Sequence, residues 1–389
     1  MGTGRVCSSG PGKADHERGI MLTREGCATR QSRLLAHMER DRAGLFVTGN
    51  YRTIYYLTGS LSVAEAPCAF ALWPDGRSTL VTAAAHPALA DETRTVETYS
   101  IDRVIDRPDL DTARLLADAL EGDVSLVSIE RAGTPALIEG LIRDLWPDAV
   151  VRDGTEVILE LRKRKEEDEI GEIRESLGLI EAAYDAARGA IAAGRTELDI
   201  YNEMQAAVVR KAGTFVPLAG DFAVGERAIR GGGPPSSRVI AEGDLYILDL
   251  FPAPHLYFGD TCRTFAAGAP SDDQHRAWEI VCEAMAIGER AIRPGVRARD
   301  VYAEMKEFLD SHPLAEKSFW HHAGHGIGHN GHEAPRIIPG SGDVFEAGDV
   351  ITLEPGIYTR ALRGGIRIED NYVVRENELE NLFQYPKNL

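Results

Sequence analysis

The stretch AIAAGRTELDIYNEM at residues 190–204 returns as AIRPGVRARDVYAEM at residues 291–305, and the two copies align without gaps. Seven positions are identical, and Ile200 stands opposite Val301 at a further apolar position. Each copy follows a long amphipathic pattern, passes through a glycine where a helix can end, and opens a second helical pattern. Chance similarity of two helix hairpins is the alternative. The repeat predicts a duplicated helix–helix–sheet unit, with two halves related by a pseudo-twofold axis and a ligand site between them.

The strands predicted after the first copy carry two aspartates. LYILDLF (245–251) has high β-propensity, yet Asp249 stands in its middle, where aspartate is uncommon. Turn residues in FPAPHLY (251–257) then lead to a second strand that carries Asp260. A hairpin of this length can bring the two carboxylates together, which is unfavourable unless a cation lies between them.

The strands predicted after the second copy carry two glutamates. DVITLEPGIY (349–358) places Glu354 at the end of a β-branched run, and GGIRIEDNYVV (364–374) places Glu369 in another. Arg367 shares a strand face with Glu369, because side chains alternate along a strand. For any single acid a solvated edge position is the alternative. Four acids on four apolar strands instead predict a metal site, because an isolated buried carboxylate is strongly penalised.

A histidine-rich segment lies between the two pairs of strands. HHAGHGIGHNGHEAP (321–335) holds five of the eleven histidines of the chain, and imidazole is the commonest metal ligand. Oxygen ligands in excess with one imidazole suit Mn(II), Fe(II), Co(II) or Zn(II) better than Mg(II) or Ca(II). Carboxylates that can bridge favour a pair of ions.

These motifs together resemble the pita-bread metallopeptidase family, which includes methionine aminopeptidase and the creatinase, prolidase and aminopeptidase P branch. ILDLF, GDTCRTF, GHGIG followed by HEAP, LEPGIY and GIRIED match the family's motifs in order and approximate spacing, from about Leu161 to the C-terminus. The resemblance implies an α+β fold. A pita-bread catalytic domain with duplicated halves would span 156–389, after a smaller α/β creatinase-like N-terminal domain at 21–155.

The resemblance also implies roles for single residues. Asp249 would chelate one metal ion, Asp260 and Glu369 would bridge both ions, and His325 would bind the second ion together with Glu354. The residues implied around the reacting group are Glu354 as general base, His332 as a contact to the substrate carbonyl, His321 as a proton-shuttle histidine and Arg367 near the carboxyl end of the substrate. His322 and His329 are predicted to pack at the surface or behind the metal ligands, rather than to take part in the chemistry.

The implied reaction is hydrolysis of an amide by two divalent ions, Mn first, with Co, Zn or Fe as alternatives. The substrate would be a peptide or peptide-like molecule, and the enzyme an Xaa-Pro dipeptidase or aminopeptidase. A second hypothesis is a metal-dependent hydrolase or lyase of the same fold acting on a non-peptide small molecule. A third is a non-catalytic binding module, which is disfavoured because all five metal ligands are present.

One position departs from the family pattern. In the peptidases a histidine precedes the first aspartate strand, in a stretch such as HGxPxDxxIxxGD, whereas RGGGPPSSRVIAEGD (230–244) has Gly232 at that place. That histidine contacts substrate in the peptidases and is the acid–base group of creatinase. Its absence argues against creatine hydrolysis and weakens the Xaa-Pro assignment. A glycine leaves room for a larger substrate, and Arg227, Arg230 or glycine N–H groups are candidates to replace the contact.

The first part of the chain predicts a separate α/β domain. GLFVTG (44–49) and a hairpin over 69–83 read as strands, and RQSRLLAHMER (30–40) reads as one of several amphipathic helices. Residues 1–20 are predicted to be a disordered leader. The charged run KRKEEDE (163–169) is predicted to be a solvated helix start, followed by a long helix with its apolar face at Ile170, Ile173, Leu177, Ile180 and Tyr184.

Composition excludes several classes of partner. The net charge is −18, which argues against nucleic acid or an anionic membrane, because both attract basic surfaces. No apolar run approaches the roughly 20 residues that span a bilayer. Five scattered cysteines without a CxxC pair favour a reducing, cytoplasmic location. The family resemblance, and not the composition, implies a homodimer.

Overall fold

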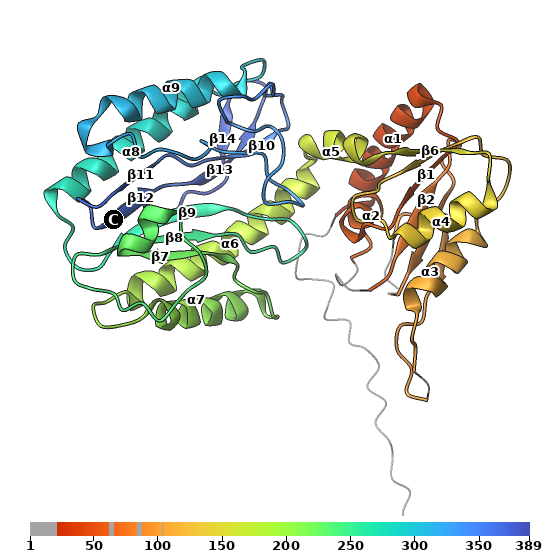
Figure 1. The fold of residues 1–389 in the computed structure, drawn as a ribbon, viewed down its shortest axis with the longest axis horizontal. Helices are drawn as coiled ribbons and strands as arrows, with labels where there is room; N and C mark the ends of the chain where they lie inside the picture. Colours follow the sequence, from red (N-terminus) through yellow and green to blue (C-terminus); the bar gives the residue numbers. More distant parts are fainter. Residues whose placement is uncertain (1–21, 62–65, 84–87, 103) are drawn as a thin grey trace, which may run out of the picture.

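The computed structural model describes residues 22–61, 66–83, 88–102 and 104–389. The predicted leader at 1–20 lies outside these residues. Figure 1 shows two bodies joined where α5 (Thr155–Lys163) is followed by α6 (Glu167–Ala190). Within the described residues, no helix is both long and apolar enough to cross a membrane.

The N-terminal body is an α/β sandwich. Its sheet has the strand order β4-β3-β2-β1-β5-β6, and the predicted hairpin is confirmed as β2 and β3, which pair antiparallel. Gly76 closes the turn of this hairpin with φ +88°, a backbone conformation that glycine adopts without strain. The elements are α1 (Arg24–Asp41), β1 (Leu45–Thr48), α2 (Tyr51–Thr58), β2 (Ala69–Leu72), β3 (Ser78–Thr82), β4 (Glu92–Thr95), α3 (Pro108–Ala117), β5 (Leu126–Ile129), α4 (Ala136–Leu145) and β6 (Val150–Asp153).

The C-terminal body confirms the predicted duplication. In the first copy α6 ends at Ala190 and α7 begins at Glu197; in the second, α8 ends at Ala291 and α9 begins at Ala298, the aligned positions. Figure 1 shows the two helix pairs on opposite sides of the strands. The elements are α7 (Glu197–Ala212), β7 (Gly220–Val224), η1 (Gly225–Arg230), β8 (Leu245–Leu250), β9 (Thr261–Ala266), α8 (Asp272–Ala291), α9 (Ala298–Ser311), η2 (Pro313–Ala315), β10 (Val350–Leu353), β11 (Gly356–Thr359), β12 (Gly364–Arg367), β13 (Asp370–Val374) and β14 (Leu379–Asn381).

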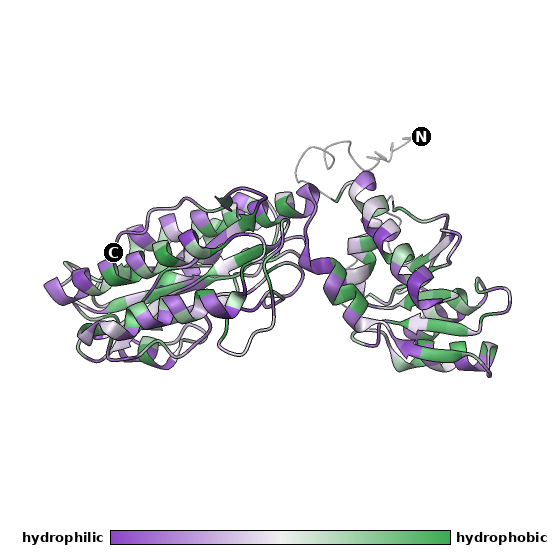
Figure 2. Cartoon of the chain, turned by 90° about the horizontal axis from the view of Figure 1, so that it is seen from above, coloured by the Kyte–Doolittle hydropathy of each residue, from purple (hydrophilic) through white to green (hydrophobic). Residues whose placement is uncertain are grey.

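The strands of this body form three small sheets, ordered β7-β8-β9, β11-β12 and β10-β13-β14. A bridge between Cys262 and Glu369 joins the first half to the second. Each helix pair covers its own apolar core: Ile200 and Met204 are buried in one, Val301 and Met305 in the other. Figure 2 shows helices striped in both colours, as expected when one face packs on a sheet.

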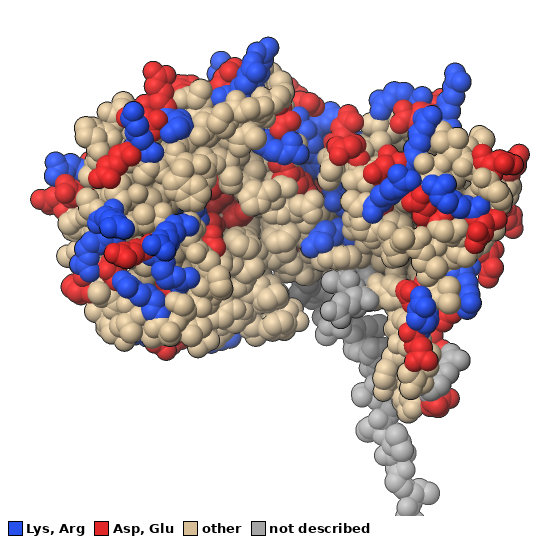
Figure 3. Space-filling view, viewed as in Figure 1, with Lys and Arg blue, Asp and Glu red and all other residues tan. Residues whose placement is uncertain are grey.

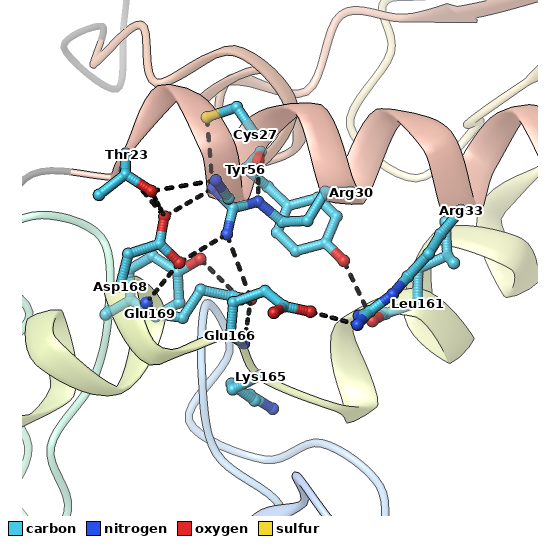
Figure 4. A network of polar contacts seen from close by, with 12 residues as sticks. Thr23, Cys27, Arg30, Arg33, Tyr56, Leu161, Lys165, Glu166, Asp168 and Glu169 are labelled. Atoms are coloured by element: carbon cyan, nitrogen blue, oxygen red, sulfur yellow. Dashed lines mark hydrogen bonds and ion pairs between the residues drawn. The ribbon is translucent and has the colours of Figure 1, made fainter.

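The junction between the two bodies is a buried ionic network, shown in Figure 4. Arg30 of α1 is fully buried. Its Nη1 lies 2.8 Å from Oδ1 of Asp168 and 3.4 Å from Oε2 of Glu169, and its Nε donates to the carbonyl of Tyr56 at 2.6 Å. The helix start predicted over 163–169 is present, because α6 begins at Glu167 and that side chain is exposed. The prediction that the run is solvated is wrong for Asp168 and Glu169, which are buried. The physical reason is tertiary, because α1 brings a guanidinium from far away in the sequence onto the start of α6.

A second buried pair links the junction to the histidine-rich segment. Nζ of Lys165 donates to Oε2 of Glu333 at 2.9 Å, and both side chains are almost completely buried. His329 lies nearby, fully buried, with its ring centroid 4.0 Å from that of Tyr257. The prediction that His329 is a packing residue is confirmed.

Candidate metal centre

The four predicted acids stand at strand positions that face one interior space. Asp249 lies within β8, Asp260 directly precedes β9, Glu354 directly follows β10, and Glu369 lies between β12 and β13. All four are buried. Each lies in or beside a strand of β-branched and apolar residues, so the strand places the carboxylate where solvent is excluded.

Strand pairing brings the two halves together at these acids. Asp249 pairs with Cys262 across β8 and β9, and Cys262 in turn bridges to Glu369. Asp260 is held by Asn371 of the second half, whose Oδ1 accepts from the Asp260 N–H at 3.1 Å. The acids of the first hairpin therefore meet those of the second half, as the duplicated repeat predicted.

His325 completes the group. Its Nε2 lies 3.4 Å from Oε1 of Glu354 and 3.8 Å from Oδ2 of Asp260. Asp260, His325 and Glu369 offer ligand atoms that all lie within 4.8 Å of one another. Nδ1 of His325 lies 3.0 Å from the Gly326 carbonyl, an arrangement that leaves Nε2 free as a ligand.

Two glycines allow the loop around His325 to pack this closely. A Cβ on Gly324 would lie 2.1 Å from the Thr352 carbonyl oxygen, and one on Gly326 would lie 2.0 Å from the carbonyl oxygen of Ala334. The loop therefore lies directly against the end of β10, where Glu354 follows. This is the tight backbone that the glycines of GHGIG predict.

The acids of this site are suited to binding cations, because the described part of the chain leaves several of their oxygens without a partner. Three of the four acids keep a buried oxygen without a hydrogen-bond partner among the described residues: Asp249 Oδ1, Asp260 Oδ1 and Glu369 Oε1. The corresponding oxygen of Glu354, Oε1, lies 2.8 Å from Nδ1 of His322. Buried carboxylate oxygens without partners are costly. Oxygen-rich ligands around one imidazole nitrogen are the donor set of a transition-metal centre.

The electrostatics of the acids support the same conclusion. Burial raises the pKa of Asp249 to about 6, although Arg367 acts to lower it. Burial and the neighbouring carboxylates raise the pKa of Asp260 and Glu369 well above the usual range. Burial alone would raise the pKa of Glu354, but His322 and the adjacent imidazoles lower it. Divalent cations among these groups would relieve the repulsion.

The other histidines of the segment border the acids. His321 is almost buried, its Nε2 lies 2.7 Å from the Tyr358 hydroxyl, and burial lowers its pKa to about 4. The His332 ring centroid lies 4.1 Å from that of His325. The expectation that both flank the acids agrees with these contacts.

His322, predicted to pack at the surface or behind the metal ligands, lies in the cavity lining against Glu354. Its Nδ1 lies 2.8 Å from Oε1 of Glu354. The motif gave no signal for this contact, because the segment is not a regular helix or strand and spacing alone does not fix side-chain direction.

Arg367 lies on the other side of the acids. It is buried and forms an ion pair with Asp249, and its Nη2 lies 3.9 Å from Oδ2 of Asp221. Asp221 was missed by the sequence analysis. The signal was present, because GDFAV (220–224) places an acid at the start of an apolar strand, as LYILDLF places Asp249 inside one.

All of these side chains line one cavity of about 440 Å³. Figure 3 shows acidic atoms recessed in the middle of the C-terminal body and surrounded by uncharged surface. Besides the four acids, the lining includes Asp221, Gly231, Trp320, Arg367 and the histidines at 321, 322, 325 and 332.

The glycine at 232 does not leave the space that was expected. Its φ is +118°, and a Cβ there would lie 2.7 Å from Cβ and Cγ of Asp221. Arg227 does not replace the missing contact either, because it is paired with Glu197 and donates to the Pro234 carbonyl at 2.8 Å. Arg230 is exposed at the end of η1. The side chain that lies against Gly232 is Asp221.

Comparison with known proteins gives two family matches. Residues 171–376 match the description "Metallopeptidase family M24", and residues 30–164 match "Creatinase/Prolidase N-terminal domain". The Xaa-Pro dipeptidase of Pyrococcus furiosus is 32% identical over 60% of this chain and 67% of its own length. The probable dipeptidase PepE of Mycobacterium bovis is 30% identical over 89% of this chain and 91% of its own.

Solved structures share the fold over nearly the whole chain. The prolidase of Pyrococcus horikoshii superposes with a TM-score of 0.78 at 24% identity, over 93% of this chain and 99% of that one. Dipeptidase PepE of Mycobacterium ulcerans superposes with a TM-score of 0.76 at 27% identity, over 95% and 98%. The expected pita-bread architecture behind a creatinase-like domain is confirmed.

Proposed function

The chain belongs to metallopeptidase family M24, and from this premise we propose that it is a dinuclear Xaa-Pro dipeptidase or aminopeptidase. Membership of the family makes it a metal-dependent peptide hydrolase. The observation that carries the proposal is the set of buried carboxylate oxygens without partners, which come from both halves and surround His325. A non-catalytic binding module that holds no metal would gain nothing to offset the free-energy cost of burying these carboxylates.

The proposed ligands are the five residues that the sequence singled out. Asp249, Asp260 and Glu369 would hold and bridge the ions, and His325 and Glu354 would complete the second site. Mn²⁺ is the proposed native ion, with Co²⁺, Zn²⁺ or Fe²⁺ as alternatives for the same donor set. When bound, such a pair supplies a water that is acidic enough to attack at neutral pH and polarises the scissile carbonyl.

The protein side chains supply proton transfer and orientation. Glu354 is proposed as the general base, the role that the family resemblance implies, and the neighbouring imidazoles keep its carboxylate ionised. His321 is hydrogen-bonded to Tyr358, which fixes its ring beside Glu354 for proton relay. His332 would steady the oxyanion of the scissile carbonyl. Arg367 would pair with the carboxylate of the leaving residue.

A second candidate function follows from the loop at Gly232. Gly232 stands where the related peptidases have a substrate-contacting histidine, and Asp221 lies against this glycine. A hydrolase or lyase of the same fold acting on a non-peptide small molecule would also accommodate this change.

The decisive experiment is a substrate screen on purified protein reconstituted with Mn²⁺ or Co²⁺. Release of proline from Xaa-Pro dipeptides is expected, and tripeptides starting with Xaa-Pro separate an aminopeptidase from a dipeptidase. If none of the peptides is hydrolysed while two ions are bound per chain, the second candidate is favoured.

Three further predictions go with this proposal. The division into domains at 21–155 and 156–389, a homodimer and a cytoplasmic location follow from the family resemblance and the cysteine pattern. Light scattering on the purified protein checks the dimer, and limited proteolysis checks the division.

A further inference from the structure

Asp221 is an acid in the active-site cavity that the metal centre does not use. It pairs directly with Asp249 across β7 and β8, so both side chains point from the same face of the sheet. Its side chain is one-third exposed and lines the cavity. Asp221 is therefore more accessible to a substrate arriving from solvent than the four proposed ligand acids are.

The glycine loop lies against both Asp221 and the ring of Trp320, which line the same cavity. A Cβ on Gly232 would collide with Asp221, and one on Gly231 would lie 3.1 Å from the ring of Trp320. Trp320 is 58% exposed, which is unusual for a tryptophan inside a cavity lining. A carboxylate and an exposed indole on the same rim are the pair of groups that recognises an ammonium or guanidinium ion.

The charges of the cavity also require a cation at this place. Two divalent ions would match the four proposed ligand carboxylates, and Arg367, which is paired with Asp249, also lies 3.9 Å from Oδ2 of Asp221. Once Arg367 pairs with the carboxylate of a leaving residue, Asp221 faces that carboxylate as a like charge. The repulsion is removed when the same residue also carries a positive charge.

We propose that Asp221 and Trp320 form a specificity subsite for a positively charged side chain on the leaving residue. The inference rests on the proposed peptide hydrolysis and names the substrate class for it: short peptides whose residue after the scissile bond is basic. An Xaa-Pro substrate is still cleaved, because one uncompensated charge lowers affinity without removing the reaction.

The test compares two peptides that differ in one charge. Alanyl-lysine and alanyl-norleucine are hydrolysed by the Mn²⁺-loaded wild type, Asp221→Asn and Glu226→Gln, the last an exposed acid of η1 outside the cavity lining. We expect the wild type to favour alanyl-lysine by about 10-fold in kcat/KM, the value of one charge-assisted contact. Asp221→Asn removes the preference, mainly through KM, and Glu226→Gln keeps it.

Trp320 gives a second, independent arm. Trp320→Ala is expected to lower the preference for lysine, whereas Trp320→Phe, which keeps an aromatic face, retains most of it. A preference in the wild type that survives both Asp221→Asn and Trp320→Ala would overturn the proposal. Equal kcat/KM values for the two peptides in the wild type would overturn it as well.

A binding measurement separates this inference from the proposed function. Calorimetry with free L-lysine and L-norleucine on the Mn²⁺-loaded protein needs no turnover. If no peptide is hydrolysed but lysine binds about 10-fold more tightly than norleucine, and Asp221→Asn abolishes the difference, the hydrolase proposal fails and the subsite stands. Equal binding of both amino acids refutes the subsite alone.

Discussion

Two regions of this molecule bury carboxylates, and they compensate them in opposite ways. At the domain junction, Asp168 and Glu169 meet the guanidinium of Arg30, and Glu333 meets Lys165. At the metal centre, the ligand acids of both halves keep oxygens without partners. The junction pairs its acids with its own cations, whereas at the centre Arg367 pairs with Asp249 alone among the proposed ligand acids, and the described residues leave Asp260 and Glu369 with partnerless oxygens.

The difference shows how a structural charge cluster is told from a functional one. A buried acid with a protein cation beside it is already neutralised, and removing the cation harms the fold. A buried acid among other acids makes the empty site less stable, and a ligand recovers that stability. The same residue types therefore predict opposite effects of substitution in the two regions.

The largest expected effect is at the metal centre. Glu369→Ala and Asp260→Ala should each abolish metal loading and lower the rate by more than about 10³-fold, because both acids are proposed to bridge the ions. Metal analysis after dialysis and initial-rate assays measure this. Glu369→Gln should also raise the melting temperature of the metal-free protein, since it removes a carboxylate whose pKa burial and repulsion have raised. Full turnover by Glu369→Ala would refute the two-metal mechanism.

At the junction, removing a charged side chain should destabilise the fold instead of stabilising it. Arg30→Met should lower the free energy of unfolding by about 3–5 kcal/mol, because it leaves Asp168 and Glu169 buried without their partner. Denaturant titration measures the loss. The matched control is Arg30→Met combined with Asp168→Asn and Glu169→Gln, which should recover part of it. Metal content per folded chain should not change, and a metal content that fell with Arg30→Met would break the contrast between the regions.

A flanking histidine should separate binding from rate within the centre itself. His332→Ala should keep both ions, because His332 is not a proposed ligand, yet lose about 10²–10³-fold in kcat through the missing oxyanion contact. Metal analysis and kcat are read on the same sample. Loss of an ion would instead place His332 among the ligands.

The smallest expected effect concerns a buried acid that shares features of both regions, because one of its oxygens has a protein partner and the other has none within the described residues. Glu172 of α6 is buried, one of its oxygens lacks a partner, and the other lies 2.8 Å from Nδ1 of His255, with Glu175 nearby. The hydrogen bond to Glu172 raises the pKa of His255 above its usual value. The stabilisation is therefore complete below the unfolded-state pKa of histidine and is lost as pH rises through the raised folded-state value.

His255→Gln should accordingly cost roughly 0.5–1 kcal/mol near pH 6 and less at alkaline pH. Thermal melts across the pH range, with Gln placed at the exposed His275 as control, measure the difference. A loss of stability that increased with pH would show that protonated His255 is not the source of the stabilisation.

The sequence by itself determined the duplication, the strand positions of the proposed ligand acids and the histidine segment. Helix ends and strand periodicity are local properties, so the repeat at 190–204 and 291–305 and the alternation in LYILDLF indicate them directly. Acids inside apolar strands are improbable without a ligand, and that improbability identified Asp249, Asp260, Glu354 and Glu369.

Only the tertiary structure decided what lies across from these residues. The prediction that 163–169 is solvated was wrong for Asp168 and Glu169, because Arg30 arrives from α1. The contact between His322 and Glu354 was not specified by the sequence, because an irregular loop sets the direction of that side chain. Asp221 became visible as a cavity residue once strand pairing set it beside Asp249 and the turn at Gly232 closed over it. Long-range contacts depend on how elements pack, and no local pattern encodes which side chain arrives from elsewhere in the chain.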